Sequence, residues 1–392
     1  MSEIILEDKE HIINTYKRFN VVIKSGHGAT FVDEDGKEYI DFSSGIGTNI
    51  FGVADKEWVD AVCNQAHILQ HASNLYYTEP QVKLAKLLCE KTGMKKVFFA
   101  NSGAESNECA IKAARKYSYD KYGEGRNEII TLVNSFHGRT IATLSATGQD
   151  VFHKYFFPFV GGFVHTPAND IEALKKNINE KTCAIMIETV QGEGGVNALD
   201  PEFIKFIDKV CKEKDLVFIV DEVQTGNGRC GYLYSYMEYG ISPDIVTTAK
   251  AVAGGLPFAA IMFSSKTEKA LGYGDHASTF GGNPICASAA YSVISRIDDK
   301  LLNHVKECRK IIEDKLLKSE GVKSISGKGL MVGVELDESI KAADVCAKCI
   351  ENGLIPLTAK TKIRLLPPLN ISFEEFNKCL DILIKSIKEV LK

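Results

Sequence analysis

One lysine, Lys250, lies in the segment TTAKAVAGG (residues 247–255), between an apolar run and a glycine pair. Its immediate neighbours are small or apolar, and the nearest acidic residue is Asp244. A lysine amine in such surroundings has a lowered pKa and can attack an aldehyde to form a Schiff base. A lysine at this position is either a solvated strand end or a group kept for covalent chemistry.

Other reactive or ligand-binding side chains also follow apolar runs. Ser102, Gly103 and Ala104 come after KVFFA and open a helical segment, and Asp221 ends LVFIVD. Glu188 follows CAIMI, and the segment NSFHGRT after EIITLV supplies Phe136, Arg139 and a histidine, His137, that we expect to be structural. Ligands of open parallel sheets bind beyond the carboxyl ends of the strands, so we expect these groups to meet in one cleft.

Three of these groups fit different parts of one cofactor. The helix start at Ser102–Ala104 offers backbone N–H groups to a phosphate. A buried carboxylate at Asp221 needs a cationic partner, such as a protonated pyridine nitrogen. With an aldehyde for Lys250, these features together predict pyridoxal phosphate.

Composition sets the class of protein in which this chemistry occurs. The chain has 392 residues, 45% hydrophobic and 25% charged, with a net charge of -4. These values are typical of a globular protein with small-molecule partners and argue against binding nucleic acid through bulk charge. The N-terminal segment lacks the features of a signal peptide, and no apolar run reaches the ~18 residues of a membrane span. We therefore expect a cytoplasmic protein, with its 11 cysteines mostly buried as free thiols.

The elements that must position the site follow an α/β pattern. Six apolar runs read as buried strands, and they alternate with amphipathic or loop segments: KVFFA, EIITLV, CAIMIE, LVFIVDE, DIVTTAK and FAAIMF. A hairpin is expected over Asp35–Gly36, and one or two long helices over residues 283–318. LMVGVEL, KIRLLPPL and a final helix capped by Ser372 and Glu375 indicate a smaller C-terminal unit. We divide the chain into residues 1–50, 51–290 and 291–392.

Three local motifs predict no site. Cys346 and Cys349 form a CxxC within a short amphipathic helix, without a second pair to complete a zinc site. GNGRCG (226–231) is separated from its strand and lacks the helix that a dinucleotide-binding turn requires. GVKSISGKG has the wrong length and the wrong last residue for a P-loop. We expect no metal.

Five segments, in order, resemble the subgroup-III, ornithine-type aminotransferases that use pyridoxal phosphate: NSGAESNECAIKAAR, FHGRT, DEVQTGNGRCG, AKAVAGGLPFAA and STFGGNP. The resemblance covers nearly the whole chain. It implies a fold-type I homodimer with shared active sites. Each subunit would have a large domain with a mainly parallel seven-stranded sheet, and a smaller α+β domain built from both chain ends.

The same resemblance implies roles for individual residues. Lys250 would carry the cofactor and move protons, and Asp221 would face the pyridine nitrogen. The remaining cofactor contacts would come from Gln224 to the ring hydroxyl, Phe136 stacked on the ring, Ser102, Gly103 and Ala104 on the phosphate, and Thr279 of the other subunit on the same phosphate. Substrate contacts would come from Arg139 to the carboxylate far from the reacting amine, Arg364 to the α-carboxylate of glutamate, Glu193 as the partner of Arg364 when that carboxylate is absent, and Glu188 near the cofactor.

SNLYYTEPQVKLAKLL and IRLLPPLNIS most resemble the acetylornithine branch of the family. This implies transfer of the terminal amino group of N2-acetylornithine to 2-oxoglutarate, a step of arginine biosynthesis. Ornithine, succinylornithine, succinyldiaminopimelate and 4-aminobutyrate remain alternative donors, and a catalytically silent cofactor-binding regulator is the alternative outside enzymes. The chain departs from the family pattern twice: FGVADKEW replaces a Gly-His-x-His-Pro turn, and Ala253 replaces a glycine.

Overall fold

The structure is a computed structural model that describes residues 2–391. Its central sheet has the strand order β4-β12-β11-β10-β7-β5-β6. The strands are β4 (Lys96–Ala100), β5 (Glu128–Leu132), β6 (Phe163–Thr166), β7 (Thr182–Ile187), β10 (Val217–Asp221), β11 (Ile245–Thr248) and β12 (Ala259–Phe263). Only β12 runs against its neighbours in this sheet, β4 and β11. The mainly parallel seven-stranded sheet is confirmed.

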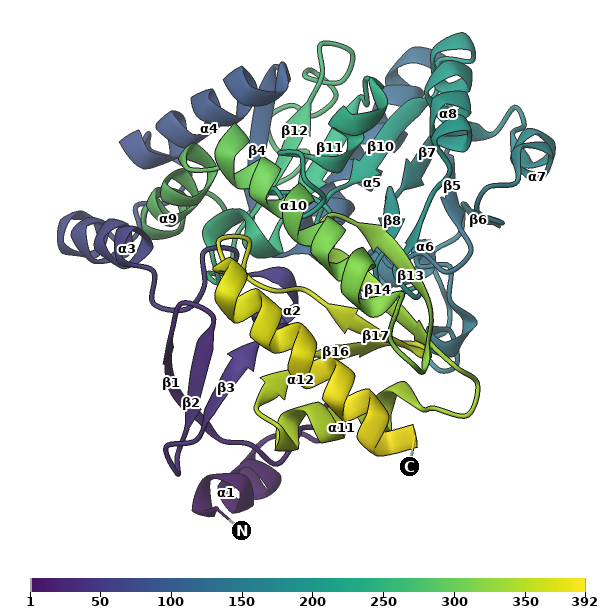
Figure 1. Ribbon diagram of the computed structural model, residues 1–392. Helices are drawn as coiled ribbons and strands as arrows, with labels where there is room; N and C mark the ends of the chain where they lie inside the picture. The colour runs from purple at the N-terminus through teal and green to yellow at the C-terminus, as the bar shows by residue number, and fades with distance from the viewer. Residues whose placement is uncertain (1, 392) are drawn as a thin grey trace.

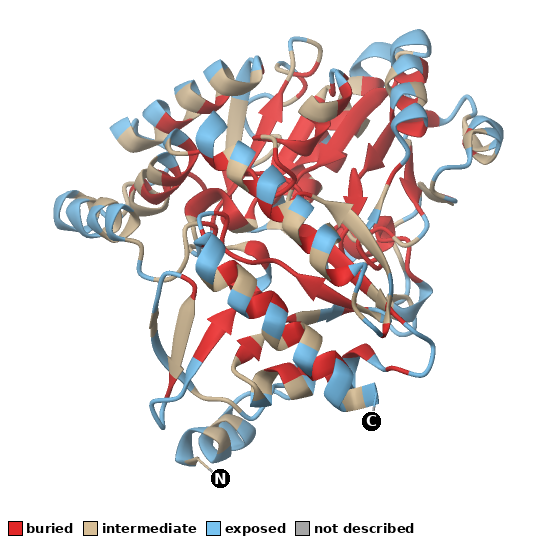
Figure 2. Ribbon diagram, in the orientation of Figure 1, coloured by how far each residue is buried: buried red, intermediate tan, exposed pale blue. Residues whose placement is uncertain are grey.

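The sequence predicted every strand of this sheet except β6. Strands β7, β10 and β12 are buried along their whole length, as expected for a sheet covered on both faces. β6 lies at the edge of the sheet and is mostly half-buried, so its four residues give no continuous apolar run. Figure 2 shows the buried residues concentrated in the central strands.

Helices cover both faces of the central sheet (Figure 1). Helix α5 (Gly103–Tyr122) packs on β11, β12 and β7, while α8 (Pro201–Glu213) contacts β10 and β7. Helices α3 (Lys56–Ile68) and α4 (Glu79–Thr92) both pack against α9 (Pro284–Ser295). The short helices α6 (Ile141–Ala146) and α7 (Ile171–Asn177) lie against β6. The sheet therefore presents its strand ends, rather than its faces, to ligands.

The two ends of the chain share a second sheet. Strands β1 (Ile23–His27), β2 (Thr30–Asp33) and β3 (Glu38–Asp41) form an antiparallel meander, which confirms the hairpin over Asp35–Gly36. Strand β15 (Leu354–Ile355), from the C-terminal part, pairs in parallel with β3. Helix α1 (Glu3–His11) precedes this sheet, and α2 (Ser44–Gly47) follows it.

A third, antiparallel sheet has the order β13-β14-β17-β16. Its strands are β13 (Val322–Lys328), β14 (Met331–Leu336), β16 (Leu357–Ala359) and β17 (Lys362–Leu365), with α10 (Asp299–Leu316), α11 (Ala342–Glu351) and α12 (Phe373–Leu391) beside them. Ser372 and Glu375 cap α12 reciprocally, as predicted. A short ribbon, β8 (Val190–Gln191) and β9 (Asn197–Ala198), completes the strands.

The three weak motifs lie in different structural elements. The P-loop-like segment forms β13, and residues 226–231 form a turn. Cys346 and Cys349 are both buried in α11, and burial raises the pKa of Cys349 to about 11. Such a thiol is inert at neutral pH, so this CxxC belongs to the core.

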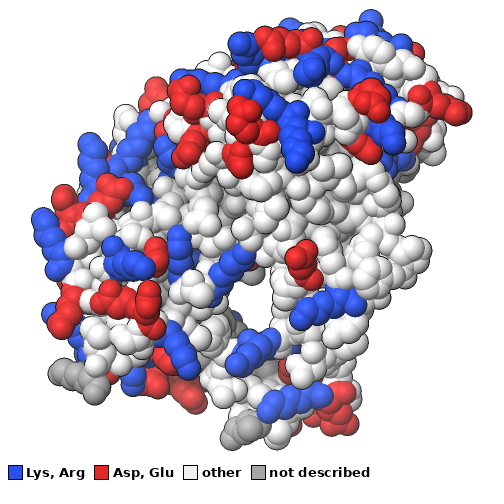
Figure 3. Space-filling model, turned by 90° about the vertical axis from the view of Figure 1, so that its right-hand side faces the viewer, with Lys and Arg blue, Asp and Glu red and all other residues white. Residues whose placement is uncertain are grey.

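No helix within residues 2–391 is long and apolar enough to cross a membrane. On the face shown in Figure 3, acidic and basic side chains are interspersed, and the middle of that face is largely uncharged. Lys and Arg side chains border a hollow in the lower part of the same face. Single-sign fields of the kind that attract nucleic acid are not seen on this face.

Candidate active site

A cavity of about 270 Å³ lies at the carboxyl ends of the central strands. Its lining brings together nine of the predicted site residues: Gly103, Ala104, Phe136, Arg139, Glu188, Glu193, Asp221, Gln224 and Lys250. Asn107, His137, Gly138 and Val223 complete it. The expected convergence of strand ends on one cleft is therefore present, with Asn107 and His137 as additions.

Lys250 occupies a conformation that few residues adopt. It follows β11 and opens a 3-10 turn (Lys250–Ala253) with φ of 44°. A side chain held at positive φ costs energy, which is typical of functional positions. Burial lowers the pKa of its amine, although Glu193 and Asp221 oppose that effect. No hydrogen bond or ion pair holds the amine among the described residues, so it is available to a ligand in the cavity.

Asp221 is the most constrained group of the cavity. Its Oδ2 accepts hydrogen bonds from Asn107 Nδ2 and from His137 Nδ1, both at 2.8 Å, and its Oδ1 accepts from the Val223 backbone N–H at 3.0 Å. Asp221, Asn107 and His137 are each at most 3% exposed. The sequence reading of His137 as structural was incomplete, because its ring contacts the predicted catalytic carboxylate directly.

The N-terminus of α5 borders the cavity. The Ser102 hydroxyl oxygen accepts a hydrogen bond from the backbone N–H of Glu105, with 3.2 Å between Ser102 Oγ and Glu105 N, and so caps the helix. A Cβ on Gly103 would lie 2.8 Å from a methyl group of Val223, so only glycine fits this close approach. The free N–H groups of the first turn and the positive helix end favour an anion here.

A second carboxylate, Glu188, lies deep in the cavity. Its Oε2 accepts the Phe136 backbone N–H at 2.9 Å. Burial, followed by the charge of Asp221, raises the pKa of Glu188 well above its ordinary value. Burial and a neighbouring carboxylate both disfavour the charged form of a carboxyl group, so these surroundings favour the protonated form of Glu188.

Two arginines lie at different places around the cavity. Arg364, on β17, is buried, and its Nη1 contacts Glu193 Oε1 at 2.5 Å. Gln224 lies between these two side chains, with its Oε1 3.3 Å from Arg364 Nη1 and its Nε2 3.2 Å from Glu193 Oε1. Arg139 is exposed, and its guanidinium stacks 4.1 Å above the Phe152 ring. One arginine is therefore paired inside, and the other faces solvent.

Thr279 does not line the cavity. It is exposed, and its neighbour Ser278 accepts a hydrogen bond from Asn101 Nδ2 at 3.1 Å. Asn74 Nδ2 also donates to the backbone carbonyls of Ser278 and Gly281. The loop around Thr279 is thus fixed near the Ser102 turn but leaves the Thr279 side chain facing outward.

The two departures from the family pattern contact each other. Asp55, within FGVADKEW, caps α3 by accepting the Trp58 backbone N–H at 3.0 Å. Trp58 then donates its indole N–H to the Ala253 carbonyl at 2.9 Å, in the turn that begins at Lys250. The indole of Trp58 therefore supports the turn that begins at Lys250.

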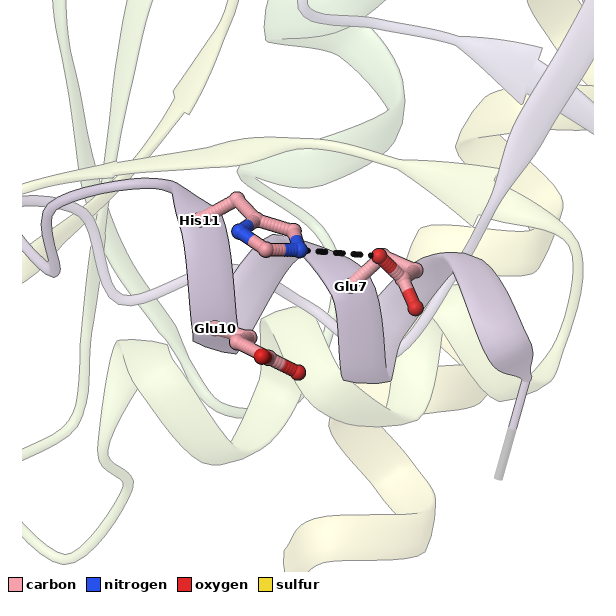
Figure 4. Close-up of side chains that lie close together, drawn as sticks. All are labelled: Glu7, Glu10 and His11. Carbon is pink, nitrogen blue, oxygen red and sulfur yellow. Dashed lines mark ion pairs between the residues drawn. The ribbon is translucent and has the colours of Figure 1, made fainter.

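One cluster of possible metal ligands lies elsewhere. Glu7, Glu10 and His11 are exposed on α1, and His11 Nε2 forms an ion pair with Glu7 Oε2 at 3.1 Å (Figure 4). The close-up shows that all three side chains come from one short helix. Neighbouring charges on one exposed helix explain this arrangement without a metal.

The comparisons with known proteins agree with each other. The sequence profile of the aminotransferase class-III family matches residues 12–387. The chain is 49% identical over 384 residues to an acetylornithine aminotransferase of Haemophilus ducreyi, covering 98% of each chain. It is 45% identical over 393 residues to one of Methanocaldococcus jannaschii, covering 99% of this chain and 97% of the relative.

Solved structures extend the likeness to three dimensions. An ornithine aminotransferase of Toxoplasma gondii ME49 matches with a TM-score of 0.95 at 31% identity, covering 99% of this chain and 95% of the other. An N-acetylornithine aminotransferase of Stenotrophomonas maltophilia matches with a TM-score of 0.85 at 30% identity, covering 96% and 98%.

Proposed function

Because this chain belongs to the class-III aminotransferases, we propose that it transfers the terminal amino group of N2-acetylornithine to 2-oxoglutarate. The products are N-acetylglutamate 5-semialdehyde and glutamate, in a cytoplasmic step of arginine biosynthesis. The observation that carries the choice of substrate is the 49% identity to an acetylornithine aminotransferase over 98% of both chains. We also keep the division into residues 1–50, 51–290 and 291–392 as a proposal.

Enzymes of this family use pyridoxal 5'-phosphate, and the cavity fits it in three places. Asp221 is a buried carboxylate with no Lys or Arg side chain bonded to it among the described residues, which suits a protonated ring nitrogen. The capped start of α5 suits the phosphate, and the unbonded amine of Lys250 suits the aldehyde. When bound, the cofactor supplies an aldehyde that accepts the amino group and a ring that stores electrons.

Residues of this chain then carry out proton transfer, substrate binding and the remaining cofactor contacts. Lys250 moves a proton from the substrate carbon that bears the amine, for which its lowered pKa prepares it. Arg139 at the exposed side binds the carboxylate distant from that amine, and Arg364 binds the α-carboxylate of glutamate. Phe136 would stack on the cofactor ring, Gln224 would bond the ring hydroxyl, and Glu188 would lie near the cofactor.

The active site is proposed to be shared in a homodimer, with Thr279 reaching the phosphate of the other subunit. The support is a group of strongly exposed apolar side chains around the Thr279 loop. Leu75 is 87% exposed, Tyr76 69%, Tyr77 100% and Phe280 60%. Asn74 ties this segment to the Thr279 loop, so both belong to one continuous surface. An apolar surface of this kind is typical of a subunit interface.

Steady-state rates with 2-oxoglutarate test the choice of amino donor. The purified enzyme is assayed with acetylornithine, succinylornithine, ornithine, succinyldiaminopimelate and 4-aminobutyrate. We expect the highest kcat/KM for acetylornithine. A higher kcat/KM for ornithine, the substrate named in several structural relatives, would overturn the substrate while leaving the family and cofactor chemistry in place.

A further inference from the structure

A buried amide, Asn107, connects Asp221 to the neighbouring strand. Its Nδ2 donates to Asp221 Oδ2 and to the backbone carbonyl of His137, both at 2.8 Å. Its Oδ1 accepts the hydroxyl hydrogen of Thr247 at 2.8 Å. Asn107 is 1% exposed and Thr247 is fully buried, so water does not compete for these bonds.

The surroundings fix which way the Asn107 amide points. Two of its three partners, the Asp221 carboxylate and the His137 carbonyl, only accept hydrogen bonds. A flipped amide would place its oxygen against both of them. The NH2 group must therefore face Asp221, which leaves the Asn107 oxygen for a donor, and the Thr247 hydroxyl is that donor.

The fold places these groups together by strand register. Asp221 on β10 and Thr247 on β11 are paired residues in adjacent parallel strands. Helix α5 packs across both strands and brings in Asn107, one helical turn after Gly103 at the phosphate end. Lys250 follows β11 after one intervening residue, Ala249. One rigid unit therefore links the groups that would meet the phosphate, the ring nitrogen and the aldehyde.

The hydrogen bonds leave Asp221 with little freedom. A carboxylate has about four acceptor positions on its two oxygens. Asn107 and His137 fill Oδ2, and the Val223 N–H takes one position on Oδ1. We propose that Asn107, itself held by Thr247, is a positioning residue that leaves Asp221 one acceptor position, on Oδ1, for the ring N–H of the cofactor. This inference rests on the cofactor chemistry of the proposed function.

The test compares two probes that differ only at the ring nitrogen. Pyridoxal phosphate and its 1-deaza analogue, which has a C–H in place of the nitrogen, are bound to the full-length apoenzyme, and dissociation constants are measured by equilibrium dialysis. Asn107→Ala should weaken binding of pyridoxal phosphate roughly tenfold or more, the equivalent of one hydrogen bond to a charged group. Binding of the deaza analogue should change less than about twofold, because no ring N–H is present to be positioned.

Thr247 provides a milder pair of variants if Asn107→Ala does not fold. Thr247→Val removes the hydroxyl and should weaken binding of pyridoxal phosphate more than binding of the deaza analogue. Thr247→Ser keeps the hydroxyl and should bind both probes like wild type. Thr131→Val is the matched control, since Thr131 is also a buried strand threonine, whose hydroxyl bonds His165 instead. It should bind both probes like wild type.

Equal weakening of both probes by Asn107→Ala and Thr247→Val, or no weakening of either, would overturn the positioning role alone. A wild-type chain that binds neither probe would overturn the proposed function and this inference together.

Discussion

Glu193, which lines the cavity, forms an ion pair with the buried Arg364, and Glu193 Oε1 lies 2.5 Å from Arg364 Nη1. Burial disfavours the charge of Glu193, but the Arg364 guanidinium, together with the charge of Lys250 and the Gln224 hydrogen bond, holds the pKa of Glu193 below its usual value. The ionised form of Glu193 is therefore favoured, and its carboxylate is the partner of the Arg364 guanidinium in this structure. On the proposed role of Arg364, an incoming α-carboxylate of glutamate would displace Glu193, whereas a donor without a carboxylate at this place would leave the ion pair intact.

This relationship predicts different damage to the two half-reactions. Arg364→Ala should slow the glutamate half-reaction roughly a hundredfold, because a charged, bidentate contact is lost. The acetylornithine half-reaction should change much less. Single-turnover rates for each half, followed by cofactor absorbance, give the comparison. Arg139→Ala is the matched variant, and it should impair the acetylornithine half. Equal damage by Arg364→Ala to both halves would contradict the proposed exchange of partners.

The shared active site can be tested with mixed dimers. Lys250→Ala homodimers should be inactive, and Thr279→Ala homodimers should bind the cofactor phosphate weakly. In a heterodimer of the two variants, one site carries both defects and the other carries neither, so about half of the wild-type activity should return. Subunit exchange is verified with differently tagged chains. Complete exchange without recovered activity would show that Lys250 and Thr279 of one chain serve the same site.

A pH-dependent contribution to stability is expected from Asp215. Burial alone would raise its pKa, but hydrogen bonds from Lys121 and Tyr122 and the charge of Lys266 lower it below the ordinary value. A depressed carboxylate pKa stabilises the fold above the unfolded pKa near 4, and this stabilisation disappears as the pH falls through the folded value.

Asp215→Asn tests that contribution without adding strain, since asparagine tolerates the positive φ of 50°. The free energy of unfolding of the variant should be roughly 1 kcal/mol lower than that of wild type at pH 7, and the difference is modest because Asp215 is partly exposed. Urea unfolding from pH 3 to pH 8 should show the difference from wild type shrinking below about pH 4. A difference that stays constant over this range would exclude the ionised form of Asp215 as its source.

The sequence predicted the central sheet because buried parallel strands are continuous apolar runs, as in residues 217–221. It also predicted which groups follow those strands, because Lys250 and Asp221 stand immediately at strand ends. The edge strand β6 was not predicted, since a half-buried strand lacks that signal.

The parts of the site that depend on pairing in space could not be predicted. The bond between Asn107 and Thr247 depends on how α5 crosses the β10–β11 pair, and sequence spacing does not encode this crossing. Trp58 and Ala253 are 195 positions apart in the sequence, so the residues around each of them do not predict their hydrogen bond. For Asn107, its position one turn after Gly103 was the available signal.

The central claim is that the unbonded amine of Lys250 carries the cofactor. Borohydride reduction of the yellow purified enzyme, followed by peptide mapping, tests it most directly. The account predicts a pyridoxyl adduct on the peptide that contains Lys250, no adduct in Lys250→Ala, and loss of turnover by several orders of magnitude in that variant. An adduct on any other lysine of the wild-type chain would contradict it.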